Sequence, residues 1–217
     1  MTTAPTPAER ALLLDYGGVL TAPVQDAFAR FEAALGVPPG DSFALLRTAS
    51  RSRDGGIIGA LERGEMDVAT FDAHLHRLLT DAGYEVPEGT DLVEGMFAAM
   101  APAGGLWALV DEVRRHGVRT GLLSNSWGTS AYPFERLART FDTLVLSGEV
   151  GLRKPDPRIY ELAMQRVGVP AQGCVFVDDL ERNVAAATEL GMHGVHHTGD
   201  DQATRAAVLA ALELDVA

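Results

Sequence analysis

Four short stretches of this 217-residue chain place charged or polar side chains after apolar runs. Asp15 follows three leucines and precedes two glycines, a pattern typical of a strand buried on both faces of a parallel sheet. Gly17 and Gly18 would let the next loop bring its backbone N–H groups close to an anion. Because such strands end at a common crevice, polar side chains that follow different strands are expected to meet there. These positions are Asp15, Ser124, Asn125, Lys154, Asp178 and Asp179.

Carboxylates, a hydroxyl and an ammonium are the groups that a metal-assisted phosphoryl transfer requires. Asp15 and Asp179 offer hard oxygen ligands for Mg²⁺, an ion that is usually shared with a substrate phosphate. Lys154 and the Ser124 hydroxyl would balance and hydrogen-bond the remaining phosphate oxygens. With its charge neutralised in this way, the Asp15 carboxylate could attack phosphorus and form an aspartyl-phosphate.

From residue 103 onward, short apolar runs alternate with segments of helical periodicity. Strands are predicted at residues 118–123, 143–146, 174–177 and 194–197, in addition to the run that ends before Asp15. Helices are predicted at residues 106–116, 134–139, 158–167, 181–190 and 203–212. This alternation implies right-handed crossovers between parallel strands. We therefore predict an α/β fold with a doubly wound, Rossmann-like sheet of five parallel strands.

Residues 21–102 show only helical patterns. Gly36 is expected to end a helix over residues 24–35, Asp41 or Ser42 to cap the next, and Asp67 to cap a third that runs through residue 79. Shorter helices are predicted at residues 57–63 and 92–100. We interpret residues 21–102 as a helical cap domain inserted into an α/β core domain of residues 1–20 and 103–217.

The composition restricts the partners and the compartment. Eighteen Lys and Arg against thirty Asp and Glu give a net charge of −12, which argues against nucleic-acid or anionic-membrane partners. The single cysteine, Cys174, excludes an internal disulfide and fits a reducing compartment. We see no leader-peptide pattern and no apolar run long enough to span a bilayer, so we expect a cytoplasmic protein. Separately, we expect either a monomer or a homodimer.

The order of the four stretches resembles the haloacid dehalogenase (HAD) superfamily of aspartate-nucleophile phosphatases. Residues 15–19 (DYGGV) lie where that family has its nucleophile loop, and residues 123–125 (LSN) are similar to its second motif. Residues 153–156 (RKPD) resemble its lysine motif, and residues 177–183 (VDDLERN) its acidic metal motif. The segments LERGEM (61–66), NSW (125–127) and GLRKP (151–155) are most similar to two subgroups, the bacterial sugar-1-phosphate phosphatases and the N-terminal phosphatase domain of soluble epoxide hydrolases. In both subgroups a helical cap follows the nucleophile loop.

The resemblance implies a Mg²⁺-dependent phosphatase that acts on a small phosphorylated metabolite, such as a sugar phosphate, through an aspartyl-phosphate. Asp15 would be the nucleophile, and the metal would be held by Asp15, the Gly17 carbonyl and Asp179. Asp178 would be a second metal ligand, or a partner that orients Lys154 or a metal-bound water. The expected phosphate-binding residues are Gly18, Ser124, Asn125 and Lys154.

Gly17 departs from the family pattern. Active family phosphatases normally carry a second Asp two residues after the nucleophile, where it acts as general acid and base. Such a group typically contributes about 10²–10⁴-fold to the rate. We hypothesise that the substrate has a good leaving group, such as an anomeric phosphate. The alternatives are a catalytically weak HAD-like module that binds a phosphorylated ligand or a protein, and a 2-haloacid dehalogenase, against which the retained pair Asp178 and Asp179 argues.

Several further residues allow two interpretations. Asn183 either supports the metal site or merely starts a helix, and Trp127 either lines the pocket mouth or anchors its helix as a buried aromatic. For Arg51, Arg53 and Arg63 we favour a solvated helix face over contact with an anionic substrate.

Overall fold

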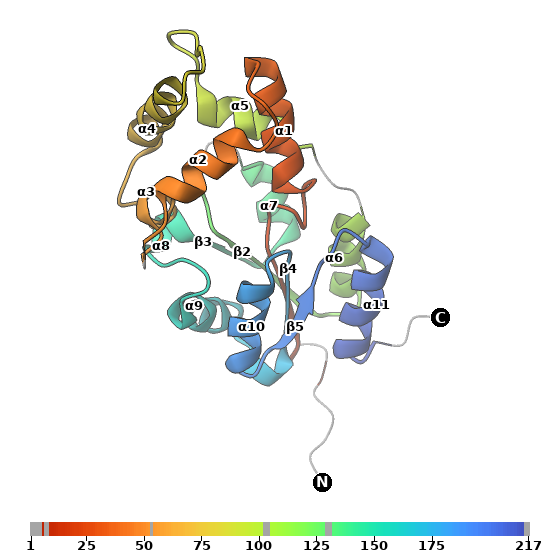
Figure 1. Ribbon diagram of the computed structural model, residues 1–217. Coiled ribbons are helices and arrows are strands. Elements are labelled where there is room, and N and C mark those ends of the chain that lie inside the picture. Colours follow the sequence, from red (N-terminus) through yellow and green to blue (C-terminus); the bar gives the residue numbers. More distant parts are fainter. Residues whose placement is uncertain (1–5, 7–8, 53, 102–104, 129–131, 215–217) are drawn as a thin grey trace.

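Five parallel strands form one sheet in the order β3-β2-β1-β4-β5 in the computed structural model, which describes residues 6, 9–52, 54–101, 105–128 and 132–214. The predicted fold class is thus confirmed (Figure 1). Leu14 of the central strand pairs with Leu122 on one side and Val177 on the other. The strands are β1 (Ala11–Leu14), β2 (Arg119–Ser124), β3 (Thr143–Leu146), β4 (Cys174–Asp178) and β5 (His193–His196).

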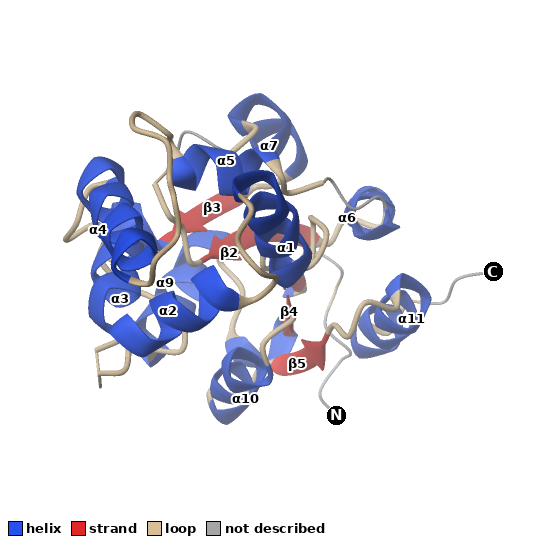
Figure 2. Cartoon of the chain, turned by 45° about the horizontal axis from the view of Figure 1, so that its top comes forward, coloured by secondary structure: helices blue, strands red, loops and turns tan. Residues whose placement is uncertain are grey.

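The central strand β1 is apolar throughout because both of its faces are covered. Alternate side chains of a strand point to opposite faces. Leu12 and Leu14 therefore pack with α6 (Gly105–Arg115), α7 (Phe134–Thr140) and α11 (Asp201–Ala211). Leu13 packs on the other face with α9 (Pro157–Val167) and α10 (Glu181–Glu189). The helices on both sides of the sheet are visible in Figure 2.

The helices of the core domain begin and end within about two residues of their predicted bounds. Two short elements have no counterpart in the prediction, namely α8 (Ser147–Val150) and the 3₁₀ turn η2 (Ala171–Gly173). Each is a single turn or less, so neither carries enough residues to show a hydrophobic period.

Five further helices pack around their own hydrophobic cluster, in which Phe28, Phe71 and Leu75 are buried. They are α1 (Val24–Leu35), α2 (Asp41–Ala49), α3 (Gly56–Glu62), α4 (Val68–Asp81) and α5 (Leu92–Ala98). This helical cap lies over the end of the sheet at which the strands finish (Figure 1). The second domain boundary, at residues 102 and 103, falls outside the described residues, so the predicted division of the chain stays a prediction.

Helix ends follow the predictions in two of three cases. Gly36 adopts the left-handed conformation after α1, and the Asp67 side chain accepts a hydrogen bond from the Thr70 N–H at the start of α4. The predicted cap of α2 is wrong, because Gly40 is its N-cap and Asp41 and Ser42 lie inside the helix. The buried side chain of Glu32, from α1, takes over the capping. A carboxylate that reaches across from another helix leaves no local sequence signal.

Replacing Glu32 with Ala is expected to lower the free energy of unfolding by about 2–4 kcal/mol. Glu32 accepts hydrogen bonds from the Gly40 N–H at 2.6 Å and the Ser42 N–H at 2.9 Å, and also from the Ser42 hydroxyl. The substitution leaves the buried N–H and hydroxyl of Ser42, and the partly buried N–H of Gly40, without this partner. Urea unfolding followed by circular dichroism measures the change, with the exposed Glu88→Ala as control. Equal stability of the two variants would contradict the capping role.

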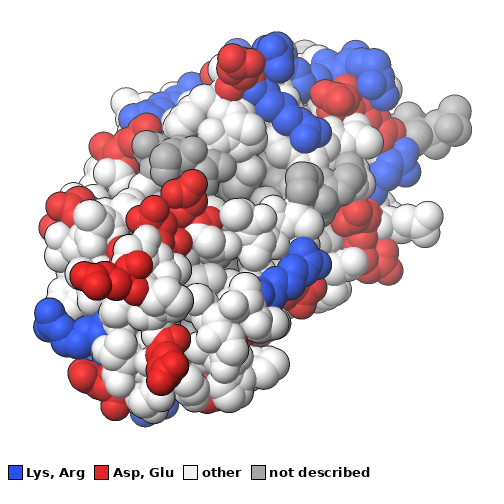
Figure 3. All heavy atoms as spheres, turned by 90° about the horizontal axis from the view of Figure 1, so that it is seen from above, with Lys and Arg blue, Asp and Glu red and all other residues white. Residues whose placement is uncertain are grey.

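Seen from above, the surface shows acidic side chains spread among uncharged residues rather than gathered into one patch (Figure 3). Within the described residues, no helix combines the length and the apolar character needed to cross a membrane.

Candidate active site

The side chain of Lys154 is the centre of the polar cluster and is only 1% exposed. Its ammonium lies 2.8 Å from Asp15 Oδ1, 2.6 Å from Asp178 Oδ2 and 2.9 Å from the Leu123 carbonyl oxygen. These three acceptors match the three donors of an ammonium group. Burial alone would lower the pKa of Lys154, but the carboxylates of Asp15 and Asp178 outweigh it and raise that pKa. The lysine therefore stays charged and fixes two loops to each other.

Asp15 lies just beyond the end of β1, where its N–H donates to the Val177 carbonyl of β4 at 2.9 Å. Its Oδ1 also accepts a hydrogen bond from the Tyr16 N–H at 2.7 Å, so the carboxylate is held in one orientation. Burial raises the pKa of Asp15 to about 7, and the negative charges of Asp178 and Asp179 act in the same direction, while Lys154 lowers it. A buried, oriented carboxylate that titrates near neutrality is a candidate nucleophile.

Asp178 is fully buried at the end of β4, and both of its carboxylate oxygens are engaged. Oδ2 accepts from Lys154, while Oδ1 accepts from the Leu180 N–H at 2.8 Å and from Asn183 Nδ2 at 2.9 Å. Asp178 thus contacts the Lys154 ammonium directly, and its predicted roles stay predictions. The same arrangement places Asn183 behind the site as a support for Asp178.

Asp179 lies at the mouth of the cluster and is partly exposed. Burial, reinforced by the charge of Asp178, raises its pKa to about 6. Gly18 has a φ of 74° and packs directly on this carboxylate, since a Cβ at Gly18 would lie 2.5 Å from Asp179 Oδ2. Only glycine fits this combination of positive φ and close approach.

The acidic cluster has the donor chemistry of a site for a hard divalent cation. One carboxylate oxygen from each of Asp15, Asp178 and Asp179 lies within 4.8 Å of the others. Because Asp178 is engaged by Lys154, Leu180 and Asn183, the carboxylates of Asp15 and Asp179 are the ones best placed to hold a cation.

Ser124 and Asn125 lie beside the acidic cluster, but their side chains form hydrogen bonds with other residues of the chain. The Ser124 hydroxyl lies 2.9 Å from the hydroxyl of Tyr132. Asn125 Oδ1 accepts from the Lys154 N–H at 2.8 Å, and Asn125 Nδ2 donates to the Lys154 carbonyl at 3.1 Å. The Gly18 N–H, in turn, donates to the Thr21 hydroxyl at 3.1 Å. The predicted phosphate-binding roles of these residues stay predictions.

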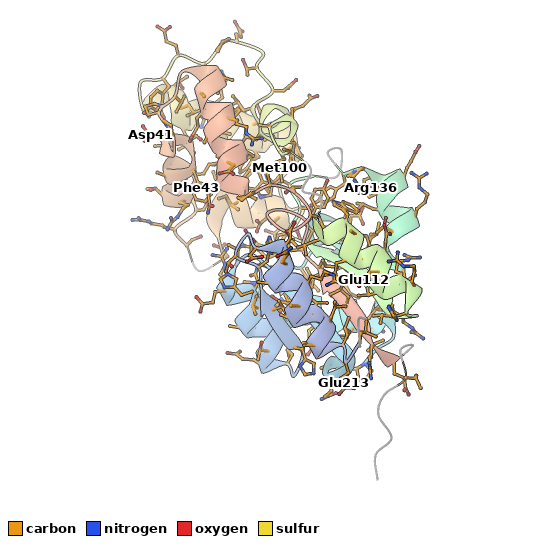
Figure 4. The ribbon with its side chains drawn as sticks, turned by 90° about the vertical axis from the view of Figure 1, so that its right-hand side faces the viewer. Asp41, Phe43, Met100, Glu112, Arg136 and Glu213 are labelled. Carbon is orange, nitrogen blue, oxygen red and sulfur yellow. The ribbon has the colours of Figure 1, made fainter. Side chains whose placement is uncertain are left out.

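Gly17 faces the base of the helical cap. A Cβ at this position would lie 3.2 Å from Val24 Cγ2 and 3.8 Å from Met100 Cε. Met100 lies where the cap meets the core domain (Figure 4). The atoms nearest to a Cβ at residue 17 are therefore apolar groups of the cap. Tyr16 packs instead against the ring of Tyr132, with centroids 4.7 Å apart.

The remaining candidates fall outside this cluster. Trp127 packs against the cap residues Phe28 and Phe71, with ring centroids 6.2 Å and 5.1 Å away, so it joins the cap to the core domain. Arg51 is exposed, in line with a solvated face, whereas the Arg63 side chain is only 19% exposed and pairs with Glu65 at 2.7 Å. Arg53 lies outside the described residues.

Two residues of the site were missed from the sequence. The Tyr132 hydroxyl is buried beside Ser124, and burial raises its pKa above its ordinary value. Glu62, at the end of α3, is buried against the loops that carry Asn125 and Arg153. A glutamate at the end of an amphipathic helix looks solvated in a sequence, so only the tertiary packing identifies it.

Comparison with known proteins gives a consistent match. A family model described as haloacid dehalogenase-like hydrolase matches residues 9–191. Acyl-CoA dehydrogenase family member 10 of Mus musculus is 29% identical over 86% of this chain and 18% of its own length. Bifunctional epoxide hydrolase 2 of Sus scrofa is 26% identical over 91% of this chain and 38% of its own. The chain thus spans less than two fifths of these two relatives. The sesquiterpene phosphatase astK of Aspergillus oryzae is 30% identical over 63% of this chain and 70% of its own.

Solved structures share the fold at low sequence identity. A HAD family enzyme from Bacteroides thetaiotaomicron, in complex with magnesium and inorganic phosphate, superposes with a TM-score of 0.65. It is 21% identical, and the match covers 88% of this chain and 96% of that one. A dehalogenase superposes with a TM-score of 0.67 at 22% identity, over 88% of this chain and 86% of that one. The fold alone therefore does not distinguish chemistry at phosphorus from chemistry at carbon.

Proposed function

Since this chain belongs to the haloacid dehalogenase-like hydrolases, we propose that it is a magnesium-dependent phosphatase of small phosphorylated metabolites that uses Asp15 as its nucleophile. The observation that carries the proposal is the buried Lys154 ammonium, held between the carboxylates of Asp15 and Asp178 at the carboxyl end of the sheet. The phosphatases among its relatives, such as the sesquiterpene phosphatase astK, support chemistry at phosphorus.

In the proposed reaction, the Asp15 carboxylate attacks phosphorus while the bond from phosphorus to the leaving oxygen breaks, which gives an aspartyl-phosphate and the free alcohol or its anion. Water then attacks phosphorus, the bond from phosphorus to Asp15 breaks, and inorganic phosphate leaves. Lys154 holds the nucleophile in place and offsets the negative charge that gathers at this end of the sheet. A magnesium ion held by Asp15, Asp179 and the Gly17 carbonyl would neutralise phosphate charge and shield the attacking carboxylate from repulsion.

Magnesium binding is expected to weaken as the pH falls from about 8 to about 5. The pKa of Asp15 is raised to about 7 and that of Asp179 to about 6, so both carboxylates are ionised at the upper end of this range and protonated at the lower end. The metal then has to displace protons, so its dissociation constant should rise about tenfold per pH unit between about pH 7 and pH 6, and more steeply below pH 6 where the second carboxylate also protonates. Calorimetric titration with MgCl₂ measures this. A dissociation constant that does not change with pH would argue against these two ligands.

The apolar surroundings of Gly17 favour a substrate whose leaving group needs little protonation, such as an anomeric or aryl phosphate. Gly17 has no positive φ, so its backbone accepts an aspartate, but Val24 leaves little room for the side chain. We therefore expect Gly17→Asp combined with Val24→Ala to speed hydrolysis of alkyl phosphates by up to about 10²-fold and that of aryl phosphates much less. Steady-state rates on matched alkyl and aryl esters test this, with Val24→Ala alone as control. An equal effect on both ester classes would contradict the hypothesis that the substrate has a leaving group that needs little protonation.

A panel of phosphate esters tests the proposed function itself. We expect the purified protein to release inorganic phosphate from at least one sugar phosphate or from p-nitrophenyl phosphate, and EDTA to stop the release. Halide release from 2-chloropropionate without phosphate release would instead identify a dehalogenase. Binding of a phosphate ester without release of either product would identify a binding module, the alternative that the loss of the usual acid at Gly17 favours.

A further inference from the structure

Glu62 is a cap residue whose carboxylate is buried in the core domain. It is the last residue of α3 and is 8% exposed. Its Oε2 lies 2.6 Å from Arg153 Nε and accepts from Asn125 Nδ2 at 3.4 Å, while Oε1 accepts from the indole N–H of Trp127 at 3.3 Å. A carboxylate is rarely buried this far unless it is paired and hydrogen-bonded, and all three partners here come from the other domain.

The partners of Glu62 are the residues that hold the catalytic lysine. Asn125 bonds both the N–H and the carbonyl of Lys154, so its amide fixes the lysine peptide. Arg153 directly precedes Lys154 in the chain, and its guanidinium pairs with Glu62. One cap side chain therefore touches the loop after β2 and the loop before α9 at once, and Lys154 projects from the second of these loops.

The backbone on either side of Glu62 packs closely against the core domain. A Cβ at Gly64 would collide with the Gly148 carbonyl of α8, and one at Gly55 would collide with the guanidinium of Arg153. Glycine at both ends of α3 thus allows the helix to lie directly on the core domain. Glu62 is therefore positioned by close backbone packing of α3 on the core domain, and not only by the reach of its own long side chain.

We propose that Glu62 is a positioning residue that couples the seating of the cap to the orientation of Lys154, acting through Asn125 and Arg153. With the cap seated, Glu62 completes the hydrogen bonds of the Asn125 amide and the charge balance of Arg153, and the lysine peptide is fixed. With the cap lifted, both partners lose Glu62, and the loop that carries Lys154 is free to relax. The rate of the chemical step then depends on the cap, and this inference rests on the proposed phosphatase function.

The test uses Glu62→Gln, which keeps the size of the side chain but removes its charge. Glu65→Gln is the matched control because it removes the same charge from an exposed cap residue three positions away, whose carboxylate pairs with Arg63. We expect Glu62→Gln to lower kcat for p-nitrophenyl phosphate by about tenfold with KM within about twofold of wild type. The control should keep both constants. A variant that melts at a lower temperature but keeps the wild-type kcat would overturn the proposal, because that is the behaviour of a merely structural residue.

A fluorescence measurement tests the contact between Glu62 and Trp127 without requiring enzymatic turnover. The chain has two tryptophans, so in a Trp107→Phe background the emission reports on Trp127 alone. Glu62→Gln should increase quenching of this emission by acrylamide, and Glu65→Gln should not. Equal quenching in both would overturn the coupling, even if the wild type proved inactive on every ester and the phosphatase proposal failed.

Trp127→Phe is a second variant in case Glu62→Gln does not fold. It keeps the aromatic packing on Phe71 and removes only the indole donor to Glu62. We expect it to lower kcat by about threefold with unchanged KM. A wild-type kcat in this variant would count against the coupling.

Discussion

Replacing Asp15 with Asn is expected to lower kcat for an aryl phosphate by about 10⁴-fold or more. The amide has the shape of the carboxylate and can still accept the hydrogen bond from the Tyr16 N–H, but it cannot attack phosphorus. Lys154 keeps its second carboxylate, Asp178, so the variant should fold. Release of p-nitrophenol in the presence of MgCl₂ measures the loss.

The control for this substitution is Asp26→Asn, which removes the same charge from an exposed position of α1. It should keep the wild-type rate within about twofold. Turnover by Asp15→Asn at a rate comparable to that of the control would end the proposal that Asp15 is the nucleophile.

The second large effect is expected from Lys154→Met, which should lower kcat by about 10³-fold and the free energy of unfolding by about 3–5 kcal/mol. Both changes have one cause. The ammonium neutralises two buried carboxylates, and its removal leaves Asp15 and Asp178 facing each other without a cation. Activity assays and urea unfolding measure the two losses in the same preparation.

A double variant separates the two roles of Lys154. Asp178→Asn added to Lys154→Met removes one of the uncompensated charges, and it should recover a large part of the lost stability. It should recover none of the lost activity, because the cation beside Asp15 is still absent. Recovery of activity along with stability would mean that Lys154 only holds the fold together.

The strands β1, β3 and β4 could be predicted from the sequence because each is a largely apolar run that ends at a polar residue. Burial on both faces requires this composition, and β1 shows it most clearly. The position of Asp15, Lys154, Asp178 and Asp179 at one end of the sheet then follows from the parallel topology. The predicted cap of α2 was wrong because a long-range carboxylate, Glu32, replaced the local one.

The different surroundings of the site's carboxylates could not be predicted from the sequence. They depend on which carboxylate oxygens already accept hydrogen bonds from other parts of the protein. Asp178 and Asp179 are adjacent in the sequence, yet one is buried against Lys154 and the other is partly open. The apolar surroundings of Gly17 come from Val24 and Met100, which lie at opposite ends of the cap in the chain. Glu62 could not be identified from the sequence for the same reason, because its proposed role depends entirely on contacts between the cap and the core domain.

The central claim is that a phosphorus atom becomes bonded to the carboxylate of Asp15. Turnover in heavy-oxygen water in the presence of hydroxylamine, followed by proteolysis and mass spectrometry of the peptide that contains Asp15, tests it directly. In the proposed reaction water attacks phosphorus, so the heavy oxygen should appear in the released phosphate and the Asp15 peptide should stay unlabelled. Trapping with hydroxylamine during turnover should meanwhile convert Asp15 to its hydroxamate. Labelled phosphate together with no trapped Asp15 would contradict the aspartyl-phosphate and indicate direct attack by water.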